Sequence, residues 1–333
     1  MSEPTGAPAG PPLSAGIRIG PARSGRVILG GATFGGMGST LSAIGSGLDD
    51  AEAYAVMDAA VALGVTVFDT ADGYADGASE RVIGAWLRDR GLSAQVSVTT
   101  KVGVAGGTVH GRDLSPARID AHARRSRERL GLEQIPMYMV HATDPATPVA
   151  DSLRAFDRLH RDGVIGALGM CNVTVEILRE WDRAADELDA IRPSWVQNEY
   201  SLLCRGDEAD VLPYCAERGL AYTAYSPLAG GVLAGRYRRG VPPPPKSRIA
   251  TLPAQYGPRL TGRVHDALDT MSGLAAERGT TVAGLALAWV MSHPLVAAPL
   301  VAPRTPAQFE AAIQAARIAL DAQERAAIAA LMS

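Results

Sequence analysis

Residues 65–81, VTVFDTADGYADGASER, decide the predicted fold. The opening apolar run, VTVF, fits a buried strand and leads directly into Asp69. Tyr74 follows five residues later in a loop of small and turn-forming residues, and a helix with apolar positions at helical spacing begins after it. A carboxylate therefore ends a strand, and a phenol lies in the loop beyond. Parallel α/β proteins build their active sites at such strand ends.

The same order of strand, loop and helix repeats along the chain. The predicted strands are apolar runs at residues 27–30, 65–68, 96–100, 137–140, 165–170, 194–196, 221–224 and 296–300. Besides the helix that begins after Tyr74, the predicted helices are amphipathic stretches at 51–63, 115–130, 148–161, 174–188, 207–218, 263–278, 306–316 and about 321–331. Eight such units over about 300 residues indicate either a (β/α)8 barrel or a doubly wound sheet.

The glycine pattern separates these two folds. A doubly wound dinucleotide-binding fold has G-x-G-x-x-G after its first strand, but Leu41 stands where the third glycine should follow Gly36 and Gly38. The sequence also contains no phosphate-binding loop that ends in Gly-Lys-Ser or Gly-Lys-Thr. We therefore predict an α/β protein with a (β/α)8 TIM barrel fold.

The barrel is predicted to be one domain that spans residues 17–333. Alternating residues before the first barrel strand predict an N-terminal β-hairpin around Ser24-Gly25. Two insertions, at 35–47 and about 230–260, follow predicted strands. We expect both to be long loops on the C-terminal face of the barrel, where they could shape a pocket.

The composition fits a globular protein with a large core, because 47% of the 333 residues are hydrophobic and only 20% are charged. A net charge of −3 spread along the chain argues against a nucleic-acid partner. Residues 1–16 are rich in Pro, Gly and Ala and lack signal-peptide features, so we predict a disordered tail. The most apolar window, 284–303, is interrupted by Ser292, His293 and Pro294, so we predict no membrane partner. The sequence gives no indication of an oligomeric state.

Cysteines and lysines add two further predictions. Cys171, Cys204 and Cys215 lack metal-ligand spacing, so we interpret them as reduced thiols in a cytoplasmic protein without a metal site. Only two of the 32 basic residues are lysines, Lys101 and Lys246. A chain that otherwise uses arginine keeps lysine where a compact, titratable ammonium is needed. Lys101 follows a predicted strand, which favours a functional role.

Six predicted strands end in polar or titratable groups. In a barrel these groups would converge on one rim, and six in phase are difficult to explain by chance because a buried barrel end is otherwise apolar. The groups are Asp69, Lys101, His141, Asn172, Gln197, and Tyr225 with Ser226.

These residue types indicate proton transfer at a carbonyl or alcohol oxygen. A tyrosine titrates near pH ~10, and a neighbouring lysine ammonium lowers that pKa while a carboxylate holds the lysine in place. Tyr74, Lys101 and Asp69 supply these three parts, and His141 could orient the same oxygen through a hydrogen bond. The set has no nucleophile and no metal ligands, so a cofactor must supply the other half of the reaction.

The chain resembles the aldo-keto reductases, specifically the bacterial branch that includes the potassium-channel β-subunits. The resemblance covers about residues 27–330 and is carried by FDTADGY followed by SE, TTKVG, HATD after a strand, GMCN, VQNEYSLL and AYSPLAGGVLAGRY. It implies a (β/α)8 barrel with an N-terminal hairpin and NADPH-dependent reduction of aldehydes and ketones. It implies Tyr74 as general acid, assisted by Asp69, Lys101 and His141.

The resemblance also implies a cofactor site. Asn172 and Gln197 would hold the nicotinamide carboxamide, and Tyr225 would stack on its ring. Arginines would clamp phosphates, because the planar guanidinium matches them. The predicted cofactor-binding set is Gly31, Ala32, Asn172, Gln197, Tyr225, Ser226, Pro227, Leu228, Gly230, Arg236, Arg248, Arg304 and Gln308. The predicted substrate pocket includes Phe34 and Ala142, and its small residues suit bulky carbonyl compounds.

Four positions depart from the pattern of the family that the chain resembles: Cys171 replaces the usual Ser, Ala75 the usual Gly, and Ala311-Ala312 an adenine-binding Glu–Asn pair. The last change leaves NADH possible beside NADPH. The alternatives to a carbonyl reductase are a nucleotide-sensing regulatory module with incidental turnover, and a dehydrogenase that oxidises an alcohol or sugar.

Overall fold

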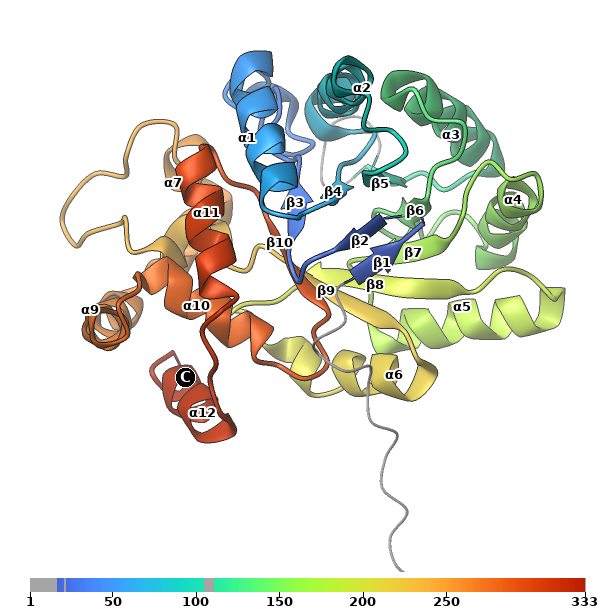
Figure 1. Ribbon diagram of the computed structural model, residues 1–333. Helices are drawn as coiled ribbons and strands as arrows, with labels where there is room; N and C mark the ends of the chain where they lie inside the picture. The colour runs from blue at the N-terminus through green and yellow to red at the C-terminus, as the bar shows by residue number, and fades with distance from the viewer. Residues whose placement is uncertain (1–16, 21, 105–110, 333) are drawn as a thin grey trace, which may run out of the picture.

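The strands form a closed parallel barrel. The computed structural model describes residues 17–20, 22–104 and 111–332, and its barrel strands follow the order β10-β3-β4-β5-β6-β7-β8-β9. The predicted (β/α)8 fold is therefore confirmed (Figure 1). The predicted tail at 1–16 lies outside the described residues. The barrel strands are β3 (Ile28–Gly30), β4 (Val67–Asp69), β5 (Ser97–Val102), β6 (Met137–Val140), β7 (Leu168–Cys171), β8 (Pro193–Glu199), β9 (Ala221–Tyr225) and β10 (Ala298–Val301).

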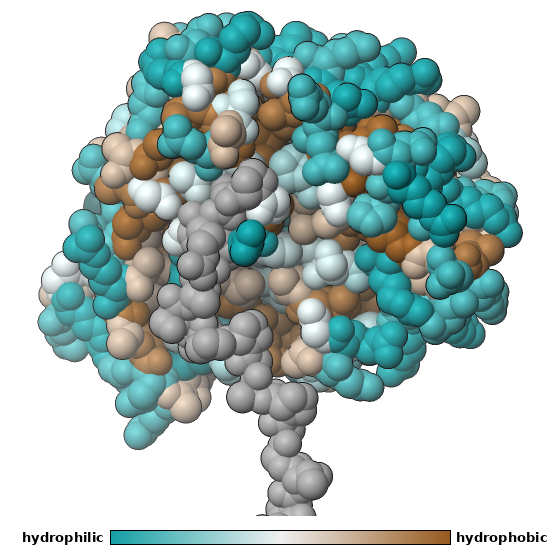
Figure 2. Space-filling model, turned by 45° about the vertical axis from the view of Figure 1, so that its right-hand side comes forward, coloured by the Kyte–Doolittle hydropathy of each residue, from teal (hydrophilic) through white to brown (hydrophobic). Residues whose placement is uncertain are grey.

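Helices surround the barrel, and hydrophilic residues cover much of the outer surface (Figures 1 and 2). The helices are α1 (Asp50–Ala62), α2 (Ala78–Arg90), α3 (Pro116–Leu130), α4 (Val149–Arg161), α5 (Val175–Leu188), α6 (Val211–Arg218), α7 (Arg248–Thr251), α8 (Pro253–Tyr256), α9 (Gly262–Glu277), α10 (Val282–Met291), α11 (Pro306–Ala315) and α12 (Ala322–Ala330). Single 3₁₀ turns are η1 (Leu41–Ala43), η2 (Tyr74–Gly77), η3 (Gly206–Glu208), η4 (Ala229–Ala234) and η5 (Gly257–Arg259).

The N-terminal hairpin covers one end of the barrel (Figure 1). Strands β1 (Ile17–Ile19) and β2 (Ala22–Ser24) are antiparallel, with Ile19 opposite Ala22. The predicted turn at Ser24-Gly25 is therefore wrong, because Ser24 pairs with Ile17 at the far end of the hairpin. Ile19 packs among residues inside the barrel. Its carbonyl oxygen accepts a hydrogen bond from Ser97 Oγ at 2.5 Å, at the first residue of β5.

The hydrophobic core has two layers. Residues that point into the barrel, such as Val67, Met139 and Trp195, form the inner layer. Larger clusters fill the space between the outer faces of the strands and the helices. The apolar window at 284–303 contributes most of α10 and all of β10 to these layers. No helix among the described residues is long and apolar enough to cross a membrane.

Both predicted insertions lie after barrel strands. The first, at 35–47, contains η1 and connects β3 to α1. The second, at 230–260, is more ordered than a long loop, because η4, α7, α8 and η5 occupy much of it. Its four consecutive prolines precede α7, where Ser247 caps the helix by accepting a hydrogen bond from Ala250 N. The short helices carry apolar residues such as Ile249 and Tyr256, which are buried.

Candidate active site

Four predicted catalytic residues meet at the C-terminal ends of β4, β5 and β6. Asp69 is the last residue of β4, and His141 directly follows β6. Lys101 lies inside β5 rather than after it, and the strand continues to Val102. Lys101 Nζ lies 5.1 Å from the centroid of the Tyr74 ring. The Tyr74 and His141 rings are 5.6 Å apart between centroids and nearly perpendicular, at 79°.

A buried ion pair joins Asp69 and Lys101. Asp69 Oδ1 accepts a hydrogen bond from Lys101 Nζ at 2.5 Å, and the two side chains are 2% and 0% exposed. Lys101 Nζ also donates to Thr70 O at 2.8 Å. The second carboxylate oxygen, Oδ2, accepts from Thr99 Oγ1 at 2.7 Å and from Gln197 Nε2 at 3.0 Å. Each charge is thus hydrogen-bonded on more than one side, as a buried pair requires.

Thr99 was not predicted from the sequence. It lies two residues before Lys101 on β5, and alternate residues of a strand face the same side. That spacing is the signal that could have placed Thr99 beside the ion pair. Thr100, which points the other way, donates to Glu80 Oε1 at 2.7 Å on α2.

Tyr74 begins a turn with unusual backbone geometry. The next two residues, Ala75 and Asp76, have φ of 47° and 53°, in the left-handed region that non-glycine residues rarely adopt. Ala75 N donates to Gly38 O at 3.0 Å, which ties the turn to the insertion after β3. The glycine that is usual in the family at position 75 would adopt this conformation without strain.

Two buried side chains of α2 anchor this turn to the barrel. Ser79 Oγ donates to Gly31 O at 2.9 Å and lies 2.7 Å from Thr70 Oγ1. Glu80 Oε2 accepts from Arg129 Nη1 at 3.0 Å, across to α3. Burial raises the pKa of Glu80, and this hydrogen bond opposes the rise. The Ser-Glu pair noted after the tyrosine motif therefore supports the turn.

The pKa of Tyr74 differs from the expectation that Lys101 lowers it. Burial raises the pKa of Tyr74 to about 12, and the negative charge of Asp69 adds to the rise. The ammonium of Lys101 does lower the pKa, but by less than burial raises it. The expected lowering below the ordinary value is therefore wrong for the protein without ligands. Tyr74 keeps its proton at neutral pH.

His141 is neutral at physiological pH. Burial, followed by the positive charges of Lys101 and Arg112, lowers the pKa of His141 to about 3. Its Nδ1 is buried and has no hydrogen-bond partner among the described residues. The backbone of His141 is held by a hydrogen bond from its N to Val102 O at 2.7 Å. A neutral imidazole with an unpaired nitrogen suits a group that exchanges a hydrogen bond with a ligand.

The two side-chain amides predicted to bind the cofactor are Asn172, directly after β7, and Gln197, inside β8. Asn172 Nδ2 donates to His141 O at 2.8 Å, and Asn172 Oδ1 accepts from Tyr225 Oη at 2.6 Å. Gln197 is buried inside β8, where its Oε1 accepts from Cys171 Sγ at 3.3 Å. Burial raises the pKa of Cys171 to about 12, so the thiol remains a donor. Both amides are therefore satisfied within the protein.

Asn198 is a second supporting residue that the sequence did not predict. Its Oδ1 accepts from Val173 N at 3.0 Å, and its Nδ2 donates to Val173 O at 2.7 Å. These two bonds fix the backbone next to Asn172, which has a φ of 57°. Asn198 Nδ2 also donates to Asp207 Oδ2 at 2.8 Å. Because the bonds of Asn198 to Val173 join segments that are distant in sequence, only the position of Asn198 beside Gln197 could have suggested this supporting role.

The predicted pyrophosphate segment, Ser226–Gly230, follows β9 directly. Ser226 and Gly230 have φ of 48° and 70°. A Cβ added to Gly230 would lie 2.1 Å from the ring of Tyr256, so the long insertion packs closely against this segment. Arg248 Nη1 donates to Tyr256 Oη at 3.3 Å, whereas Arg236 is exposed. Pro227 is buried and Leu228 is half-buried in the same segment.

The predicted adenosine segment lies at the start of α11. Arg304 N donates to Gln308 Oε1 at 2.8 Å, and Arg304 Nη2 lies 3.4 Å from the carbonyl oxygens of Ser46 and Gly47. This segment therefore contacts the insertion after β3. Of the two alanines that depart from the family pattern, Ala311 is exposed, whereas Ala312 is buried in the outer core.

Residues after β3 complete the predicted sites. Gly31 N donates to Asp69 O at 2.7 Å, and a Cβ on Gly31 would lie 2.8 Å from Ser79 Oγ. Ala32 O accepts from Gly38 N at 2.7 Å. Phe34 is 1% exposed and packs in the outer hydrophobic cluster, whereas the other predicted pocket residue, Ala142, follows His141. Residues 105–110, between β5 and α3, lie outside the described residues.

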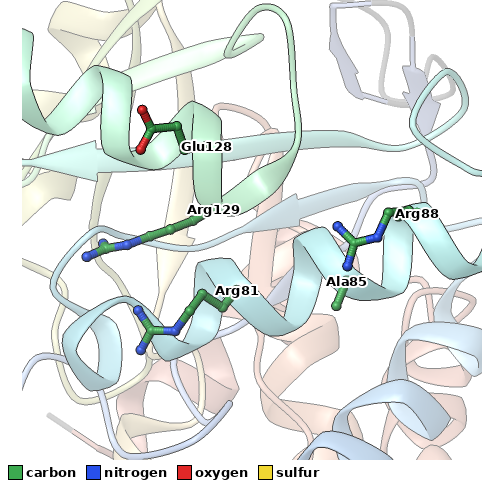
Figure 3. Close-up of a pocket in the computed structure, with 5 residues that line it drawn as sticks. All are labelled: Arg81, Ala85, Arg88, Glu128 and Arg129. Carbon is green, nitrogen blue, oxygen red and sulfur yellow. The ribbon is translucent and has the colours of Figure 1, made fainter.

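An open groove of about 400 Å³ lies between α2 and α3, on the outer layer of helices (Figure 3). It contains none of the predicted site residues. Arg129, which anchors the Tyr74 turn through Glu80, is one of its walls. The residues that line the groove are Arg81, Ala85, Arg88, Glu128 and Arg129.

The fold and this cluster define a (β/α)8-barrel protein whose candidate active site lies at the C-terminal ends of the strands. The chain belongs to the aldo/keto reductase family, because the family model matches residues 26–333. Members of this family are oxidoreductases that use nicotinamide cofactors, so the predicted family and the prediction of an oxidoreductase are confirmed.

Relatives are found in bacteria and plants. An uncharacterized oxidoreductase, YrpG, from Bacillus subtilis is 33% identical over 82% of this chain and 84% of its own length. A probable voltage-gated potassium channel subunit beta from Oryza sativa is 34% identical over 76% and 78%. The NADH-specific methylglyoxal reductase of Escherichia coli is 33% identical over 69% and 72%. A solved structure, the glycerol dehydrogenase of Gluconobacter oxydans, is 27% identical with a TM-score of 0.80, covering 96% of this chain and 95% of that one.

Proposed function

We propose that this protein reduces an aldehyde or ketone to an alcohol, with Tyr74 as general acid and NADPH as hydride donor. The observation that carries the proposal is the buried Asp69–Lys101 pair beside the rings of Tyr74 and His141. The pair is isolated from water, and a charge in such surroundings acts strongly on a neighbouring phenol.

The cofactor site is proposed from residues at or near the C-terminal ends of β7, β8 and β9. Asn172 is exposed, and the Tyr225 side chain is accessible beside it, so both can contact a planar carboxamide-bearing ring. The left-handed residues at Ser226 and Gly230 lie in a segment where backbone N–H groups can converge on phosphate oxygens. When bound, the nicotinamide supplies a hydride to the carbonyl carbon.

The chain's own residues supply the proton and hold the substrate oxygen. Tyr74 carries its proton at neutral pH, because its pKa is about 12. As negative charge develops on the carbonyl oxygen, the proton moves from Tyr74 Oη to that oxygen. Lys101 stabilises the phenolate that remains, and Asp69 keeps the ammonium in place. Neutral His141 donates a hydrogen bond that orients the same oxygen.

NADPH is proposed over NADH because arginines lie near the predicted phosphate positions. Arg304 contacts backbone carbonyls only through bonds of 3.4 Å, so its guanidinium is free to exchange these weak contacts for a 2′-phosphate. The E. coli relative is named as NADH-specific, which keeps NADH as the alternative. The ratio of the two kcat/KM values measures the preference.

Two other functions are favoured by the names of relatives. The plant relatives are named as probable potassium channel subunits, which supports a nucleotide-sensing module with incidental turnover. The structural neighbour is named as a glycerol dehydrogenase, which supports oxidation of an alcohol at the same site. A sensor would bind NADPH without appreciable turnover, and a dehydrogenase would favour NADP+ with an alcohol.

The test follows nicotinamide absorbance with purified protein, NADPH and 4-nitrobenzaldehyde. The wild type should consume NADPH, and Tyr74→Phe should lose roughly a hundredfold or more in kcat while still binding NADPH. Tyr54→Phe is the matched control, because Tyr54 lies on α1 and its hydroxyl bonds to Asp89 at 2.9 Å, away from the site. Equal rates for wild type and Tyr74→Phe would refute the assignment of the acid. Binding without any consumption would favour the sensor.

A further inference from the structure

Arg112 is fixed next to the strand that carries Lys101. Beyond β5, Val104 forms an antiparallel bridge with Arg112. The next residue, Asp113, donates from its N to Gly103 O at 3.1 Å. Arg118 Nη2, from α3, donates to Val104 O at 2.9 Å and holds the same backbone from the other side. The position of Arg112 is therefore set by backbone bonds to the end of β5.

This bridge also contacts the segment that follows His141. A Cβ added to Gly103 would lie 3.1 Å from Ala142 O. Leu114 N donates to Asp144 Oδ2 at 3.1 Å. The backbone at Arg112 thus lies beside the residues after Lys101, and its neighbours Gly103 and Leu114 contact the segment after His141. In a (β/α)8 barrel, these two loops lie on the face where the substrate binds.

The positive charge of Arg112 has no ion-pair partner in the part of the chain that the structure describes. Among the described residues it has no carboxylate within 4 Å, and its guanidinium donates only to the neighbouring Gly111 O at 3.3 Å. Residues 105–110, AGGTVH, include no acidic residue. The nearby carboxylates are engaged elsewhere: Asp113 Oδ1 accepts from Ser115 N, and Asp144 accepts from backbone N–H groups after it and at Leu114.

The field of Arg112 reaches the candidate catalytic histidine. Its charge contributes to the lowered pKa of His141, after burial and Lys101. A substrate whose carbonyl lies against His141 would therefore lie within the field of the Arg112 guanidinium. The side chain is only half-buried, so it is accessible to a ligand. A guanidinium binds carboxylate or phosphate oxygens through two parallel hydrogen bonds.

We propose that Arg112 is a specificity-determining residue that selects carbonyl substrates carrying an anionic group, a carboxylate or a phosphate, away from the carbonyl. This inference rests on the proposed carbonyl reductase function. The Arg112 guanidinium gives the predicted substrate pocket one charged contact. This contact orients the substrate with its carbonyl toward Tyr74 and His141.

Matched aldehydes test the inference. We expect the wild type to reduce 4-formylbenzoate with a kcat/KM roughly tenfold or more above that for 4-methylbenzaldehyde, because one charge-assisted bidentate contact is gained. Arg112→Gln should remove this preference through a higher KM for 4-formylbenzoate, with little change for the neutral aldehyde. Arg112→Lys should keep part of it, and added salt should reduce it. Arg154→Gln, an exposed arginine on α4, is the charge-matched control.

A second pair separates the two anion types. The kcat/KM for glyceraldehyde 3-phosphate is compared with that for glyceraldehyde. If the ratio of these two values is larger than the ratio in the benzaldehyde pair, and is lost in Arg112→Gln, phosphate is the preferred group. Equal kcat/KM values within both pairs, or an equal loss on neutral and anionic aldehydes in Arg112→Gln, would overturn the inference. If the neutral aldehyde is reduced without anion preference, the inference fails and the proposed function stands.

Binding keeps the inference testable if no aldehyde is reduced. Benzoate is titrated calorimetrically into the protein saturated with NADP+, and into Arg112→Gln under the same conditions. We expect benzoate to bind the wild type at least roughly tenfold more tightly than the variant. Equal affinities would overturn the inference independently of turnover.

Discussion

Removing one partner of the Asp69–Lys101 pair should cost far more stability than removing both. Lys101→Met leaves a buried carboxylate with only the neutral donors Thr99 and Gln197. Asp69→Asn leaves a buried ammonium without its counter-charge, facing neutral acceptors such as Thr70 O. Each single change should therefore destabilise the protein by about 3–5 kcal/mol, because it leaves an unpaired charge in a dry site.

The double variant Asp69→Asn/Lys101→Met has no buried charge. If the two single costs were additive, they would sum to about 6–10 kcal/mol, which exceeds the whole stability of many domains. We expect the double variant to cost only about as much as one single change, so the coupling free energy should be roughly 3 kcal/mol or more. The side-chain exposures of 2% and 0% support this size, since water does not screen the pair.

Urea denaturation of all four proteins, followed by tryptophan fluorescence and circular dichroism, measures the cycle. Similar m-values show that the unfolded states are comparable. Costs below about 1 kcal/mol for each single change, with additivity within about 0.5 kcal/mol, would refute the interpretation of the pair as a desolvated unit. All three variants should lose reductase activity, so stability and turnover report separate roles of the pair.

Three further results are expected. The kcat/KM for reduction should stay level through neutral pH and fall only as the pH approaches the Tyr74 pKa of about 12, because a general acid works only while it is protonated. A pH–rate profile that declines around neutral pH would contradict this expectation. Asp76→Gly should raise the free energy of unfolding by about 1 kcal/mol, because the exposed Asp76 has a φ of 53°, in the left-handed region that glycine adopts without strain. Unchanged or lower stability in urea denaturation would contradict this expectation. Gly230→Ala should weaken NADPH binding by roughly tenfold or more, because its Cβ would meet the Tyr256 ring at 2.1 Å. Gly240→Ala is the control, because Gly240 has a φ of 72° and an added Cβ there has nothing within 4 Å. Equal NADPH affinities of the two variants in fluorescence titrations would rule out an effect of the clash with Tyr256.

The barrel could be predicted because its signals are local. Each strand is a short apolar run, and each functional residue follows or ends such a run, as Asp69 and His141 do. The strand ends were less predictable. Polar side chains inside a barrel interrupt the apolar pattern while the backbone continues as a strand. For this reason β5 runs through Lys101 and β8 runs beyond Gln197.

The supports of the site could not be predicted, because their partners are distant in sequence. Thr99 and Gln197 meet at one carboxylate oxygen of Asp69, although they lie 30 and 128 residues from it. The sign of the Tyr74 pKa shift was wrong for a related reason. The lysine was evident from the motif, but the burial that outweighs its charge depends on the packing of the whole rim.

The consequence of having cysteine at position 171 follows from its hydrogen-bond partner, Gln197. Gln197 Nε2 donates to the Asp69 carboxylate, a charge-assisted bond, whereas Gln197 Oε1 accepts from the Cys171 thiol, a weak donor. The amide oxygen is therefore the end that a cofactor carboxamide can take over at little cost, while the nitrogen stays on Asp69. At the proposed cofactor site, Asn172 would instead exchange its 2.6 Å bond from the Tyr225 hydroxyl, and that exchange would free the Tyr225 ring to turn against the nicotinamide. On the proposed cofactor site, cysteine in place of serine thus weakens a bond that binding must break.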